Sequence, residues 1–115
     1  MSKSGPIRLY RRNDLIIGFC IEDKKGDPYD LTSAAEITFV VAWNNEIKFT
    51  KSLGDGVVIV DGPEGEIDVF ISSEDSDISA GVYQFELLIV DQLGNRLVAD
   101  QDAFIVEHSL TYANV

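Results

Sequence analysis

In residues 81–90 every second side chain from Tyr83 to Ile89 is apolar, whereas the positions between them mix polar residues such as Gln84 and Glu86 with apolar ones. A period of two places successive side chains on opposite faces of a β-strand, so this stretch predicts a half-buried strand with an apolar inner face. Residues 91–95, which include Gly94, have the composition and length of a hairpin loop. The extended run after them reaches Val106 and predicts the antiparallel partner. The inner face of the first strand carries Tyr83, Phe85, Leu87 and Ile89.

Earlier stretches show similar short extended runs between clusters of turn-forming residues. The pattern predicts an all-β fold of seven to nine short strands without a long helix, which is typical of an antiparallel immunoglobulin-like β-sandwich, with a barrel as the alternative closure. A single helical turn is expected near residues 73–77 and a β-bulge near residues 100–102. The pair Asn44-Asn45 has the composition of a tight hairpin turn.

The aromatic residues of these strands are expected to fill the space between two sheets. Tyr83 follows Ala80 and Gly81 as in a tyrosine corner, in which the hydroxyl ties down a neighbouring loop. Cys20 is the only cysteine, so no intrachain disulfide can form, and its apolar strand predicts a place in or near the core. The expected core aromatics are Phe19, Phe39, Trp43, Phe70, Tyr83, Phe85 and Phe104.

Charge and length narrow the possible partners. The 115 residues include 20 acidic and nine basic ones, for a formal charge of -11. Phosphate groups and anionic lipids require a basic surface, so neither nucleic acid nor a membrane is an expected partner. We expect one domain, with a flexible arm at 1–6, a β-sandwich at 7–107 and a tail at 108–115. The arm lacks the apolar core of a signal peptide, which predicts residence in the cytoplasm or in something assembled there.

Four of the nine basic residues lie within the first dozen positions. A basic arm on an acidic body favours head-to-tail contact between copies; alternatively, the charges protect an edge strand from unwanted pairing. On the first interpretation the arginines make contacts at one end of the molecule and the tail makes them at the other, and changing the arginines to glutamate should abolish assembly. The predicted contact residues are Arg8, Arg11 and Arg12, and Leu110, Thr111 and Tyr112.

Side chains that could carry catalysis or hold a metal are few. His108 is the only histidine and lies in the expected tail, so the sequence predicts neither a cysteine–histidine nucleophile nor a zinc site. We therefore expect a non-enzymatic protein without a cofactor. Acidic loops around Asp27, Asp61 and Asp75 could supply oxygen ligands to calcium, or their Asp and Ser residues could be present because they favour turns.

Five segments of the chain together carry a family resemblance. The run from Asp23 to Thr32 reads D-x-x-G-x-P-x-D-L-T, and the run from Ala80 to Phe85 reads A-G-x-Y-x-F. Both patterns resemble the small immunoglobulin-like domains of tailed-phage structural proteins, such as the N-terminal domain of baseplate upper proteins. Asn13-Asp14 stands where those domains open with Gly-Asp. The similarity covers roughly residues 7–106, and its remaining segments are Gly65-Glu66-Ile67 and residues 90–95.

The resemblance implies a non-enzymatic virion component, in the neck, tail, baseplate, fibre adaptor or capsid decoration. Its partners would be other phage structural proteins and, because virions are symmetric, further copies of itself. Its location would be the virion, after assembly in the host cytoplasm. A different class of function stays open, namely a carbohydrate- or cell-surface-binding module in which Trp43 or Tyr29 forms an exposed stacking platform.

Overall fold

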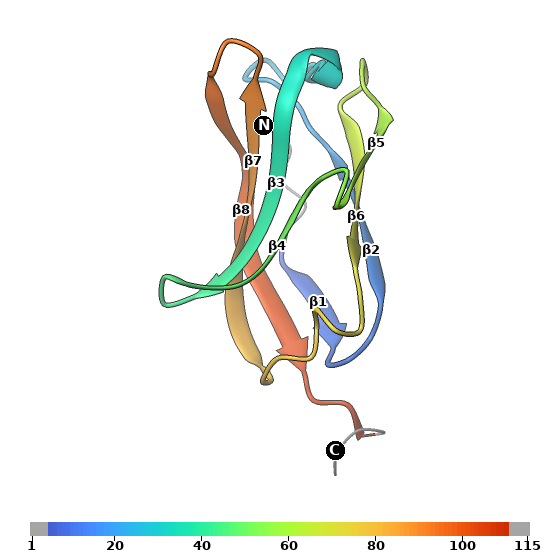
Figure 1. Ribbon diagram of the computed structural model, residues 1–115, viewed down its shortest axis with the longest axis vertical. Coiled ribbons are helices and arrows are strands. Elements are labelled where there is room, and N and C mark those ends of the chain that lie inside the picture. The colour runs from blue at the N-terminus through green and yellow to red at the C-terminus, as the bar shows by residue number, and fades with distance from the viewer. Residues whose placement is uncertain (1–4, 111–115) are drawn as a thin grey trace.

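The computed structural model describes residues 5–110 of the chain, and eight strands within them form a β-sandwich (Figure 1). The all-β class predicted from the alternation is therefore confirmed. A short 3-10 turn, η1 (Leu31–Ser33), precedes the third strand, and Asp30 caps it by accepting a hydrogen bond from the Thr32 N–H. The strands are β1 (Ile7–Tyr10), β2 (Leu15–Cys20), β3 (Ala34–Trp43), β4 (Glu46–Leu53), β5 (Gly56–Asp61), β6 (Glu66–Ile71), β7 (Gly81–Asp91) and β8 (Arg96–Glu107).

The strands are hydrogen-bonded in the order β1-β8-β7-β3-β4-β5-β6-β2. β4 and β5 share only two residue pairs, Ser52 with Gly56 and Leu53 with Val57, so the order bends at this corner. Two layers result, with β3, β7 and β8 on one side of Figure 1 and β5, β6 and β2 on the other. β1 pairs with β8 in parallel, whereas its successor β2 pairs with β6 in the opposite layer. The short link between β1 and β2 therefore crosses from one sheet to the other.

Phenylalanine rings fill the space between the layers. The rings of Phe39 and Phe85 stack with their centroids 5.4 Å apart, and Phe19 lies 6.1 Å from Phe85. Phe49 meets Phe104 edge to face at 5.8 Å. Such pairs contribute about 0.5–1.5 kcal/mol each beyond the burial of their area. The predicted inner face of β7 is confirmed, because all four of its members are buried: Tyr83, Phe85, Leu87 and Ile89.

Three residues expected in the core lie on the surface instead. Trp43 is 55% exposed and Phe70 is 41% exposed, and Cys20 is also exposed. Trp43 is the last residue of β3, and the β3–β4 hairpin that follows projects sideways from the sandwich, away from β5, β6 and β2 (Figure 1). The other two follow the period of two: Phe70 alternates with buried neighbours in β6, as Cys20 does in β2, so both side chains point outward.

The local features predicted from the sequence are present. Asn44 and Asn45 both have positive φ, as a type I′ hairpin turn requires. The register between β7 and β8 shifts so that Ala99 is the extra residue of a β-bulge. The Ser76 N–H donates to the Ser72 carbonyl at 3.1 Å and closes the single helical turn expected there. The Tyr83 hydroxyl donates to the Ser79 carbonyl at 2.5 Å, which confirms the tyrosine corner.

Candidate interaction surfaces

The three arginines predicted to contact partners are paired with acidic residues of the same chain. Arg8 Nη1 lies 2.8 Å from Glu107 Oε1. Arg11 Nε and Arg12 Nε both lie 3.0 Å from Asp77 Oδ1. The hydrogen bond from Arg12 is the main cause that lowers the pKa of Asp77, with Arg11 adding to it. The arginines therefore serve to hold the β6–β7 loop and the end of β8 in place.

The prediction that these arginines and Leu110 lie at opposite ends of the molecule is wrong. Because β1 runs parallel to β8, both strands finish at the same end, and the Arg11 N–H donates to the Glu107 carbonyl at 2.8 Å. Leu110 follows shortly after β8 and is 89% exposed. Thr111 and Tyr112 lie outside the described residues.

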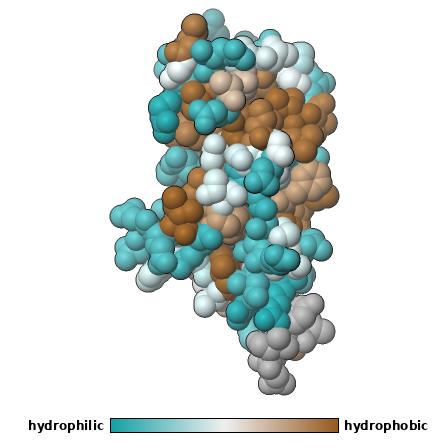
Figure 2. Space-filling model, in the orientation of Figure 1, coloured by the Kyte–Doolittle hydropathy of each residue, from teal (hydrophilic) through white to brown (hydrophobic). Residues whose placement is uncertain are grey.

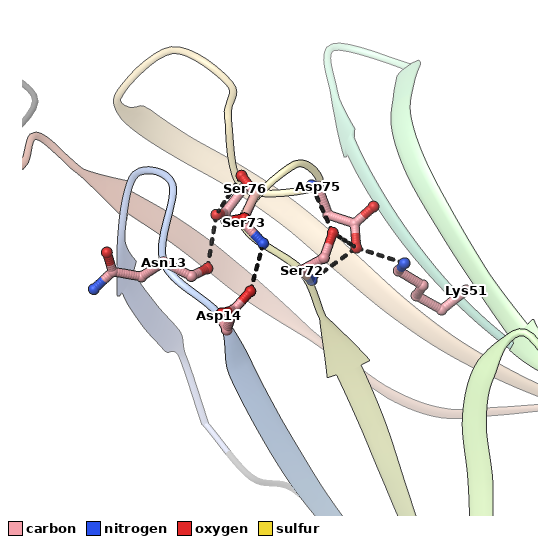
Figure 3. A network of polar contacts seen from close by, with 7 residues as sticks. All are labelled: Asn13, Asp14, Lys51, Ser72, Ser73, Asp75 and Ser76. Atoms are coloured by element: carbon pink, nitrogen blue, oxygen red, sulfur yellow. Dashed lines mark hydrogen bonds and ion pairs between the residues drawn. The ribbon is translucent and has the colours of Figure 1, made fainter. Parts of the chain in front are cut away.

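A network of polar contacts ties the β1–β2 link to the segment between β6 and β7 (Figure 3). Ser76 Oγ donates to the Asn13 carbonyl at 2.8 Å, and the Ser73 N–H donates to Asp14 Oδ1 at 2.7 Å. Ser76 is fully buried, and no buried side-chain nitrogen or oxygen among residues 5–110 lacks a hydrogen-bond partner. Both segments cross between the two sheets, so the network fastens the sandwich at this end.

Asp75 forms the second half of the network shown in Figure 3. Its Oδ2 accepts hydrogen bonds at 2.9 Å from both the N–H and the hydroxyl of Ser72, and Lys51 Nζ lies 2.5 Å away. Burial opposes ionisation of this carboxyl group, but the hydrogen bonds from Lys51 and Ser72 outweigh it, so the pKa of Asp75 lies below its ordinary value. The ion pair attaches the end of β4 to the β6–β7 loop.

The outer face of the β5-β6-β2 sheet carries four exposed large apolar side chains, and we call it the apolar outer face. The register places Ile16 of β2 opposite Phe70 of β6, and Gly18 opposite Asp68. Val58 of β5 pairs with Asp68 from the other side. Figure 2 shows hydrophobic surface gathered in the upper half of the view, toward the side that β5 occupies in Figure 1. The exposed fractions of its large apolar residues are 59% for Ile16, 49% for Val58, 56% for Val60 and 41% for Phe70.

Two hollows mark the apolar outer face. One, of about 280 Å³, lies over Gly18 and is bordered by Cys20, Val60, Glu66 and Asp68, and we call it the upper hollow. The other, of about 380 Å³, is bordered by residues that include Ile16, Phe70, Gly56 and Lys51, and we call it the lower hollow. The contact-residue prediction missed this surface. A detectable signal was present, because the outward positions of β2, and those of β5 before Asp61, are apolar or glycine as well as the inward ones.

A separate hollow of about 350 Å³ lies beside Trp43 at the β3–β4 hairpin. Lys48 and residues 79–83 complete its lining, and Lys48 Nζ lies 3.4 Å from Glu46 Oε1. Trp43 is thus available as a platform, whereas Tyr29, the other predicted platform residue, is partly buried against the core.

The acidic loops are organised by hydrogen bonds within the chain. Asp23 Oδ1 accepts the N–H groups of Lys25 and Asp27 at 2.8 and 3.1 Å, as expected of a turn-forming aspartate. Asp91 plays the same part in the β7–β8 loop, where the side chain and N–H of Asn95 lower its pKa. Among residues 5–110, no three His, Cys, Asp or Glu side chains are grouped closely enough to hold a metal ion.

No protein-family model and no curated protein matches the chain. Several solved structures are similar to it in fold, including the following two. One belongs to the fibronectin(III)-like modules of Clostridium thermocellum CbhA, with 10% identity, a TM-score of 0.50, and coverage of 95% of this chain and 99% of the other. The second is a GspB Siglec domain, with 16% identity, a TM-score of 0.51, and coverage of 91% of this chain and 55% of the other.

These likenesses and the strand order define the fold as an immunoglobulin-like β-sandwich of the kind found in fibronectin(III)-like modules. At these identities they establish the fold alone. In the described part of the chain, no helix has the length and apolar character that crossing a membrane demands.

Proposed function

We propose that the chain is a non-enzymatic structural component of a tailed-phage particle, in the neck, tail, baseplate, fibre adaptor or capsid decoration. It would work by contact with other structural proteins and with further copies of itself, in the virion. The observation that carries this proposal is the apolar outer face, since contiguous exposed apolar surface marks a site of interaction. The resemblance of residues 23–32 and 80–85 to domains of tailed-phage structural proteins is the reason for proposing a phage particle as the location.

Quantitative mass spectrometry of purified particles tests this proposal. The particles would come from a phage that encodes the chain, and the amount of chain would be scaled to the major capsid protein. We expect a fixed copy number, with hundreds indicating capsid decoration or the tail tube, and about six to a few dozen indicating the neck, baseplate or fibre. Absence of the chain from the purified particles would contradict the proposal.

The exposed Trp43 favours a second candidate, a carbohydrate- or cell-surface-binding module. Its indole lies beside the 350 Å³ hollow, where Lys48 and Ser79 offer polar groups next to the ring. An aromatic platform with nearby hydrogen-bonding groups is a common way to hold a sugar ring. Titration of Trp43 fluorescence with soluble oligosaccharides checks this candidate. Saturable quenching that disappears in a Lys48→Ala variant is expected for a binding module, and an unchanged spectrum would contradict it.

A further inference from the structure

The apolar outer face differs from scattered surface hydrophobics because its members are neighbours on adjacent strands. Ile16 lies directly opposite Phe70, and Val58 lies on the third strand opposite Asp68, which is two residues from Phe70 and on the same face. Each is between 41 and 59% exposed. Single exposed apolar residues are normal on soluble proteins, whereas a contiguous group is typical of a binding surface.

The charges of this face are all of one sign. β2, β5 and β6 contain no lysine or arginine, and the outward charged residues of β6 are Glu66 and Asp68. Lys51, at the border of the lower hollow, is already paired with Asp75. A second copy docked face to face would bring like charges together, which costs free energy at an interface. Charge complementarity therefore favours a basic partner.

Gly18 leaves the centre of the upper hollow open. A β-carbon at this position would meet only Asp68 Oδ1, at 3.6 Å, and the backbone does not have the positive φ that requires glycine. Glycine also weakens a strand interior relative to residues with side chains. The fold itself thus has room for a larger residue at Gly18, and the hollow can receive an apolar side chain from outside.

We propose that the apolar outer face docks a segment of another protein that carries apolar side chains flanked by lysine or arginine. The apolar side chains would fill the hollows over Gly18 and beside Phe70, while the basic groups would pair with Asp68 and Glu66. The charge of -11 would also attract such a segment over longer range. This inference rests on the proposed function in one respect, namely that the chain acts through contact with another protein.

The test uses two synthetic peptides and the full chain labelled with ¹⁵N. One peptide alternates lysine with valine, and the other alternates glutamate with valine. In amide spectra, the lysine peptide should shift residues of β2, β5 and β6, and the effect should weaken with added salt. The glutamate peptide should leave these residues unchanged. Equal shifts with both peptides, or lysine-peptide shifts that avoid this sheet, would overturn the proposal.

Variants then localise the binding. Gly18→Val should fill the upper hollow and Asp68→Lys should reverse the charge beside it, each lowering affinity for the lysine peptide about tenfold or more. The matched controls are Gly81→Val, an exposed strand glycine with open space around it, and Asp55→Lys, an exposed loop position. Both controls should bind as the wild type does. Unchanged affinity in Gly18→Val and Asp68→Lys, with the fold intact, would show that the lysine peptide does not bind at the apolar outer face and would overturn the proposal.

Two further outcomes separate this inference from the proposed function. Concentration-dependent dimers in sedimentation, with concentration-dependent amide shifts in β2, β5 and β6, would assign the face to a second copy. This result would overturn the inference. Peptide binding at this face, together with absence of the chain from particles, would contradict the phage function while leaving the docking face established.

Discussion

Two regions of the molecule differ in how many of their side chains are paired with other groups of the same chain. At the β1–β2 end, charged groups are abundant, and the arginines and the adjoining network are joined to groups of the same chain. On the apolar outer face, charged groups are few, and large side chains such as Ile16 and Val60 remain more than half exposed. Charge content alone therefore does not show which side chains the fold leaves without partners in the same chain, and these are the side chains that our proposal assigns to contact with another protein.

The network end owes its stability to long-range pairing across the sandwich. Arg8 and Glu107 are 99 residues apart in the sequence, and Arg11 and Asp77 are 66 apart. Removing one member of such a group leaves its partners without hydrogen bonds, whereas changing an outward residue of the apolar outer face leaves nothing unsatisfied. The two regions should respond to substitution in opposite ways.

The largest effect is expected for Asp75→Ala. Loss of the carboxylate leaves Lys51 and the Ser72 N–H without their acceptor in a partly buried site. The free energy of unfolding should fall by about 1–3 kcal/mol, measured by urea denaturation. Asp55→Ala, in the exposed loop between β4 and β5, is the matched control and should change stability by no more than about 0.5 kcal/mol. Equal losses of stability at both positions would contradict a stabilising role for the contacts of Asp75.

Acid should abolish the difference between wild type and Asp75→Asn. The pKa of Asp75 is lower in the folded protein than its ordinary value, so the stabilisation is fully present above the unfolded-state pKa of about 3.9 and is lost as pH falls through the folded pKa. We therefore expect a constant difference in stability from neutral pH down to about pH 5, which then shrinks below about pH 4. Denaturation curves across this range measure it. A difference that grows toward low pH would contradict the assigned ion pair.

The double change Arg11→Gln and Arg12→Gln should have a smaller effect. Both arginines pair with Asp77 at the surface, where water and salt screen the charges, so these ion pairs contribute little to stability. Glutamine removes the charge without placing a new carboxylate against Asp77, which glutamate would do. Urea denaturation at low and high salt should show the loss mainly at low salt. Loss of peptide docking in this variant would contradict the assignment of the apolar outer face.

Val58→Thr should change stability least. The side chain keeps its shape and is already 49% exposed, so the free energy of unfolding should stay within about 0.5 kcal/mol of wild type. The neighbouring Val57 is 1% exposed and points into the core, so Val57→Thr should cost about 1–3 kcal/mol, because its hydroxyl would be buried. Thermal and urea denaturation of the two variants measure how differently the two faces of β5 respond.

Much of the fold could be predicted from the sequence because it depends on local patterns. The inward residues of β7, the turn at Asn44-Asn45 and the hydroxyl contact of Tyr83 all follow from spacing and residue type. The exposure of Phe70 was also available from its alternation with Val69, although its aromatic character favoured the core. Trp43 lies outside because its hairpin projects away from the facing sheet, which depends on how the two sheets are arranged.

The candidate site could not be predicted in the same way. The pairing of Arg8 with Glu107 depends on the parallel addition of β1 to β8, which places Arg8 beside the last residues of β8. The apolar outer face depends on the order of β5, β6 and β2, because only neighbouring strands join Ile16, Phe70 and Val58 into one surface. The apolar outward positions of β2 and β5 are a local signal, but this signal does not show which strands become neighbours, and the pairing of Arg8 with Glu107 has no local signal.

The most direct test of the central claim compares two variants in assembled particles. Phage would be grown with the chain replaced by Gly18→Val or by the triple variant Arg8→Gln, Arg11→Gln and Arg12→Gln, and mass spectrometry would measure the copies in each purified particle. If the apolar outer face makes the essential contact, the triple variant should be incorporated normally and Gly18→Val should be lost. Normal incorporation of Gly18→Val together with loss of the triple variant would contradict the account.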